Sequence, residues 1–95
     1  MYAIAIIRYR RSLEGAEDAR DEHRKYLLDL KKKGLLIASG PFEPHFGGAL
    51  LLRIPDLETL DRIRDEDPFT KLKVAQYELQ IWNVKTGKDD LDGIG

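Results

Sequence analysis

His23 and Asp67 are the residues whose chemistry could move a proton in this sequence. Ala19 and Leu27 lie four positions to either side of His23, so helical spacing directs its ring toward the protein interior. A carboxylate that binds one imidazole nitrogen fixes the tautomer and leaves the other nitrogen free to act on a ligand. If the two side chains meet, His23 would be a general acid or base, and Asp67 would orient it or share the proton transfer.

Each of these residues also has a purely structural interpretation. His23 could be a core histidine whose hydrogen bonds are satisfied, and Asp67 could form a turn with Pro68 by bonding to its own following backbone. Their separation in sequence does not say whether they meet. Solvent access distinguishes the two interpretations, because a sealed pair is typical of structure and a pair that lines an open cavity is typical of function.

Five further residues could contact a ligand: Arg8, Ser39, Gly40, Pro41 and Phe69. Arg8 could hold an anion from the end of a strand, or it could be a solvated strand end. Ser39 could donate a hydrogen bond to a ligand, or it could be a turn residue before Gly40. Phe69 would cover the pocket as a lid or fill the core.

Composition excludes several other functions. The chain of 95 residues has no cysteine, which excludes disulfides, zinc–thiolate sites and thiol catalysis and fits a cytoplasmic protein. Its 16 basic and 17 acidic residues argue against a nucleic-acid partner. His45 lies in a loop rich in Pro and Gly without a second nearby histidine, and no phosphate-binding glycine motif is present. We therefore expect no metal and no cofactor.

The elements that must position these side chains follow from hydrophobic periodicity. The first apolar run is too short to cross a membrane and has the pattern of a strand, so no membrane partner is expected. The pattern predicts strands over 2–9, 35–40, 48–54 and 74–84, helices over about 16–33 and 56–66, and a loop around Gly15.

This β-α-β-β-α-β order favours a ferredoxin-like α+β fold with an antiparallel sheet and both helices on one face. Residues 1–84 are predicted to form a single domain, and 85–95 a polar, flexible C-terminal tail. The first and third strands are apolar on both alternations, so the helix-free face should also be covered. A homodimer through that face is the simplest way to cover it.

Several short motifs, taken in order, resemble the YCII family. The family pattern has a histidine on the first helix, a glycine at the end of that helix and a Ser- or Ala-Gly-Pro turn. A glycine pair then opens a strand, and Asp-Pro-Phe follows the second helix. This sequence supplies the pattern from Tyr2 to about Trp82 as His23, Gly34, Ser39-Gly40-Pro41, Gly47-Gly48 and Asp67-Pro68-Phe69.

The resemblance implies a dimeric α+β barrel and a pocket that holds His23 and Asp67. It also implies a small-molecule enzyme with cofactor-free acid–base chemistry, of the isomerase or lyase class by analogy with muconolactone-isomerase-like proteins. The alternative is a non-catalytic module that binds a small ligand or serves dimeric interaction. The segment 70–78 lacks the glycine that the family usually has there, so the pocket mouth is expected to differ in shape.

Overall fold

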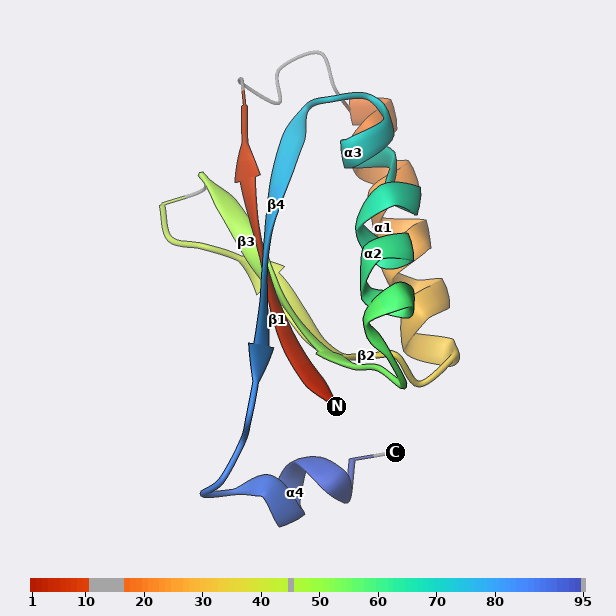
Figure 1. The fold of residues 1–95 in the computed structure, drawn as a ribbon. Coiled ribbons are helices and arrows are strands. Elements are labelled where there is room, and N and C mark those ends of the chain that lie inside the picture. Colours follow the sequence, from red (N-terminus) through yellow and green to blue (C-terminus); the bar gives the residue numbers. More distant parts are fainter. Residues whose placement is uncertain (11–16, 45, 95) are drawn as a thin grey trace.

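The computed structural model describes residues 1–10, 17–44 and 46–94, so the predicted loop around Gly15 and the loop residue His45 lie outside the described residues. A four-stranded sheet carries the two long helices on one face (Figure 1). The elements in chain order are β1 (Tyr2–Tyr9), α1 (Glu17–Lys32), β2 (Leu36–Pro41), β3 (Gly47–Arg53), α2 (Leu57–Glu66), α3 (Pro68–Lys71), β4 (Ala75–Trp82) and α4 (Lys88–Asp92).

The sheet has the strand order β2-β3-β1-β4, and every neighbouring pair is antiparallel. The ferredoxin-like α+β architecture predicted from the sequence is therefore confirmed. β1 and β3 are the two central strands, and both are apolar on both alternations. The two predicted long helices and all four predicted strands are present, with ends that differ by at most two residues.

The core lies between the sheet and the helices. Ala5 of β1 stands opposite Leu50 of β3 and Leu79 of β4, so these side chains share the face that the helices cover. Leu30 of α1 and Ile63 of α2 complete this layer from the helical side, and both are buried. Burial of one face of each helix in this way is what stabilises helices of this length.

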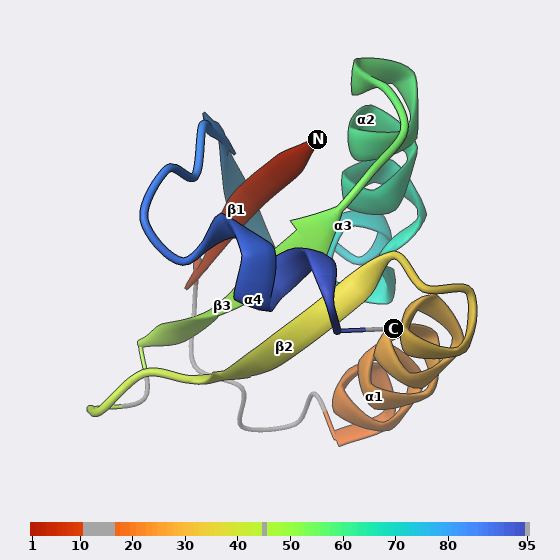
Figure 2. The same cartoon turned by 90° about the horizontal axis from the view of Figure 1, so that it is seen from below.

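Two short helices are not predicted by the sequence pattern. α3 follows α2 directly, and α4 lies beyond β4 near the ends of β1 and β3 (Figure 2). The Tyr2 hydroxyl donates to the carboxylate of Asp92, and the Arg53 guanidinium donates to the carbonyl of Leu91. α4 therefore packs on one end of the helix-free sheet face. Within the described part of the chain, no helix is both long and apolar enough to cross a membrane.

Candidate active site

Asp67 marks the point where one helix ends and the next begins. Its backbone is extended, with φ −65° and ψ 129°, as expected for a residue that precedes proline. Pro68 occupies the first turn of α3, where its missing N–H costs nothing. The Asp67 carboxylate caps α3 by accepting from the backbone N–H of Phe69 at 2.9 Å. The Asp-Pro-Phe motif is thus a helix break that fixes the position of a carboxylate.

α1 directs His23 onto this carboxylate. His23 Nδ1 lies 2.8 Å from Asp67 Oδ1, although the two residues are 44 positions apart in the chain. Because a carboxylate only accepts hydrogen bonds, this geometry assigns the Nδ1 hydrogen to the Asp67 bond. Asp67 is completely buried, whereas the His23 side chain keeps 12% of its surface exposed. The pair is therefore sealed on the aspartate side and open on the histidine side.

Tyr77 is the third partner, and the sequence analysis missed it. Its hydroxyl donates to Asp67 Oδ2, so both carboxylate oxygens are held. Burial raises the pKa of Tyr77 well above its ordinary value, and the negative charge and hydrogen bond of Asp67 raise it further. A signal was present in the sequence, because Tyr77 alternates with Leu79 and Ile81 and so shares their face of β4. A tyrosine on a buried face needs a hydrogen-bond partner.

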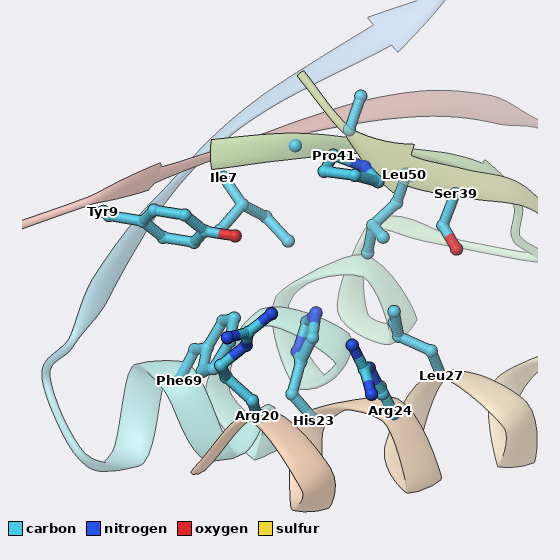
Figure 3. Close-up of a pocket in the computed structure, with 13 residues that line it drawn as sticks. Ile7, Tyr9, Arg20, His23, Arg24, Leu27, Ser39, Pro41, Leu50 and Phe69 are labelled. Atoms are coloured by element: carbon cyan, nitrogen blue, oxygen red, sulfur yellow. The ribbon is translucent and has the colours of Figure 1, made fainter. Parts of the chain in front are cut away.

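The open side of His23 lines a cavity of about 240 Å³ between α1 and the sheet. Figure 3 shows the His23 ring directed from α1 toward the sheet, with the Ser39 and Tyr9 hydroxyls on the opposite wall. The Phe69 ring stacks on the imidazole at 4.0 Å between centroids and 8° between planes, and Tyr9 meets Phe69 edge-on. The cavity therefore combines an apolar lining with a few directed polar groups, as binding sites for small molecules do.

The structure brings most of the predicted ligand residues to this cavity. Ser39, Gly40, Pro41 and Phe69 all line it. Arg8 does not, because side chains alternate along β1 and Ile7 and Tyr9 face the helices. Arg8 instead lies on the opposite face, where it binds Glu78 at 2.9 Å and both side chains are more than half exposed. The structure thus favours the solvated strand end for Arg8.

Two arginines of α1 also line the cavity and were not predicted. Arg20 precedes His23 by three positions, so the two share one face of the helix, and Arg24 follows next to His23. Both guanidinium groups point toward the cavity in Figure 3. The spacing of Arg20 from His23 was the available signal, but charged residues on a helix are usually solvated and gave no reason to single it out.

The glycine pair at the start of β3 has a steric cause. A Cβ atom on Gly47 would lie 1.8 Å from the carbonyl oxygen of Ile7, and one on Gly48 would lie 2.5 Å from the carbonyl oxygen of Gly40. Any side chain there would push β3 away from its neighbours. Gly48 also lines the cavity, so the pair sets how closely the strands come together along its wall.

No group of three His, Cys, Asp or Glu side chains within the described residues could hold a metal ion.

Comparison with known families shows which family the chain comes from. The family model of the YCII-related domain matches residues 1–83 of this chain. The chain belongs to the YCII-related domain family. No curated protein matches this chain in sequence.

Among solved structures, this YCII-related chain is similar to the 5-chloro-2-hydroxyhydroquinone dehydrochlorinase TftG of Burkholderia phenoliruptrix, determined in complex with 2,5-dihydroxybenzoquinone. The two share 23% sequence identity with a TM-score of 0.77 over 94% of this chain and 98% of that one. At this identity the similarity establishes the ferredoxin-like fold.

Proposed function

We propose that this YCII-related protein is a small-molecule enzyme in which His23 transfers a proton without a cofactor. One observation carries the proposal: His23 is bound through Nδ1 to the buried Asp67 while the ring lines an open cavity. A carboxylate in that position orients the imidazole and stabilises the imidazolium that forms when the other nitrogen accepts a proton. The alternative of a purely structural pair predicts a histidine sealed on both sides.

The reaction proceeds by proton removal and either proton return or loss of a leaving group. His23 Nε2 takes a proton from an acidic C–H or O–H group of the ligand, and the electron pair left behind is delocalised into the ligand. In an isomerisation, the imidazolium returns the proton to another atom of the ligand. In an elimination, the electron pair expels the leaving group with its bonding electrons, and the imidazolium later releases its proton to solvent. Both routes balance without an oxidant or reductant.

Elimination is the route that the structural comparison supports. TftG is named as a dehydrochlorinase, and removal of HCl takes one proton and one chloride from a substrate. The residues of this cavity suit that reaction, because His23 provides the base and the Ser39 and Tyr9 hydroxyls face it across the cavity. A cavity of about 240 Å³ fits a ligand smaller than a typical drug molecule.

The experiment uses 5-chloro-2-hydroxyhydroquinone and a panel of enolisable cyclic ketones and phenols. Chloride release is measured with an ion-selective electrode, and exchange of substrate protons in D2O is measured by NMR. His23→Gln should slow the reaction at least about 10²-fold, since general acid–base groups contribute roughly 10²–10⁴-fold. Lys32→Gln, on an exposed position of α1, is the control variant. Binding without any His23-dependent turnover would support the non-catalytic module instead.

We also propose that the chain forms a homodimer through the helix-free face of its sheet. Ile4 and Leu51 stand opposite each other on that face, Ile6 lies beside them, and all three are half-buried in the single chain. α4 packs on only one end of the face, at Tyr2 and Arg53. A second copy would cover the remaining apolar side chains.

A further inference from the structure

Arg20 and Arg24 place two positive charges at the cavity beside His23. Neither guanidinium forms an ion pair with any residue in the described part of the chain. By contrast, Lys25 of α1 lies 3.4 Å from Glu22, and Lys33, which directly follows α1, lies 2.9 Å from Asp29. The two arginines at the cavity thus keep their positive charge unmatched by any described carboxylate.

The lining of the cavity contains no acidic residue among those described. The carboxylate of Asp67 is completely buried behind His23 and already accepts from His23, Phe69 and Tyr77. Its oxygens are therefore not available to the arginines or to a ligand. The electrostatic character of the open space is set by the two guanidinium groups of Arg20 and Arg24, which favour an anion.

An apolar groove continues from this cavity along α1. The groove has a volume of about 400 Å³ and shares Arg24, Leu27 and Ser39 with the cavity. Beyond these residues it is lined mainly by aliphatic side chains, including Leu28, which is 63% exposed, and Ile37 of β2. A ligand whose charged end lies at the arginines therefore has an apolar surface on which to place the rest of its body.

We propose that the ligand of this site is a small organic carboxylate, held by Arg20 and Arg24, with an apolar body that extends past Leu27 into the groove. The planar guanidinium fork matches a carboxylate with two parallel hydrogen bonds, which a neutral amide of the same shape cannot accept in the same way. This inference rests on the proposed function in one respect, since it takes the cavity at His23 as the ligand site. It adds the charge of the substrate and the residues that select it.

The test compares 3-phenylpropanoate with 3-phenylpropanamide, which have nearly the same shape but differ in charge. Binding is measured by NMR from the backbone amide of Ser39 and the ring protons of His23. The carboxylate should bind at least about 10-fold more tightly than the amide, since charge-assisted bonds are roughly twice as strong as neutral ones. Added salt should weaken binding of the carboxylate and leave the affinity for the amide nearly unchanged.

Three variants locate the effect. Arg20→Gln and Arg24→Gln should each reduce carboxylate affinity several-fold, and the double variant should bind the carboxylate and the amide alike. Lys32→Gln removes the same unit of charge from an exposed position of α1 and should retain the preference. The inference is overturned if the double variant still prefers the carboxylate to the amide, if the wild-type protein shows no such preference, or if the carboxylate does not bind.

This experiment is independent of turnover. Arginine-dependent binding of the carboxylate without any His23-dependent reaction on the substrate panel would support the inference and contradict the proposed enzyme. Conversely, a His23-dependent reaction on a neutral substrate, with no effect of the two arginine variants, would support the enzyme and contradict the inference.

Discussion

Tyr77→Phe should destabilise the protein, because it removes a hydrogen bond to a buried carboxylate. The Tyr77 hydroxyl donates to Asp67 Oδ2, whereas the His23 and Phe69 bonds are both made to Oδ1. Phenylalanine keeps the ring and removes only the donor. Oδ2 would then lose the one hydrogen bond described for it, inside a residue with no exposed surface.

The magnitude follows from the charge on the acceptor. A hydrogen bond to a charged group contributes about 1.5–3 kcal/mol, whereas a bond between neutral groups contributes about 1 kcal/mol. Tyr26→Phe is the matched control, because the Tyr26 hydroxyl donates to the backbone carbonyl of Ile63 at 2.8 Å. We expect the free energy of unfolding to fall by roughly 2–3 kcal/mol in Tyr77→Phe and by about 1 kcal/mol in Tyr26→Phe.

Urea unfolding at pH 7 and a fixed protein concentration measures both values, since self-association would make stability depend on concentration. Combining Tyr77→Phe with Asp67→Asn in a double-mutant cycle isolates the interaction between the two side chains. The cycle should give a coupling energy of at least about 1 kcal/mol. A Tyr77→Phe variant no less stable than Tyr26→Phe, or a coupling energy near zero, would refute the assignment of Tyr77 as the residue that holds Asp67.

Four further predictions follow from single features of the structure. Burial raises the pKa of Tyr77 and of Tyr26 above the ordinary tyrosine value of about 10. The stability that the two neutral hydroxyls contribute is therefore complete below pH 10 and is lost as the pH rises beyond it, and the thermal midpoint of unfolding should fall over that range. Gly47→Ala should lower the free energy of unfolding, measured in urea, by about 1–3 kcal/mol, because the added Cβ would overlap the Ile7 carbonyl. Lys73→Gly should be neutral or stabilising by up to about 1 kcal/mol, because Lys73 has a positive φ of 59°. Ile6→Glu should convert a dimer to a monomer in light scattering if the helix-free face is the interface.

Each of these predictions has a control variant or a result that would contradict it. Tyrosine absorbance that titrates fully below pH 10 in the folded protein would contradict the pH prediction. Gly40→Ala should be tolerated, because a Cβ there has no atom within 4 Å. Lys73→Ala should not stabilise, since alanine has the same difficulty at positive φ. Leu28→Glu changes an exposed residue of α1 and should leave the oligomeric state unchanged.

The long helices and strands were predicted well because their apolar patterns extend over many residues. α1 and α2 repeat their apolar residues over several turns, and the Asp-Pro dipeptide predicted the end of α2 correctly at Glu66. α3 spans only Pro68–Lys71, and α4 only Lys88–Asp92, so neither is long enough to show a helical period. Their positions follow from tertiary contacts instead.

The site was only partly predictable for a different reason. The inward direction of His23 follows from Ala19 and Leu27, but its contact with Asp67 depends on how α1 and α3 pack, which spacing along the chain does not contain. The face of Arg8 could not be assigned, because β1 is apolar on both alternations and either face could have met the helices. Once Ile7 is placed in the core, the positions of Arg8 and Tyr77 both follow from strand register.

Phe69 explains why the histidine and the aspartate are held as one unit. Its backbone N–H donates to Asp67 Oδ1, and its ring stacks in parallel on the imidazole of His23. The same residue therefore fixes the carboxylate through the backbone and the plane of the imidazole through the side chain. Pro68 sets the direction in which α3 starts, so the helix break that punctuates the sequence also orients both partners. A displacement of α3 would move the carboxylate and the stacking ring together, which makes this four-residue helix the element on which the geometry of the site depends.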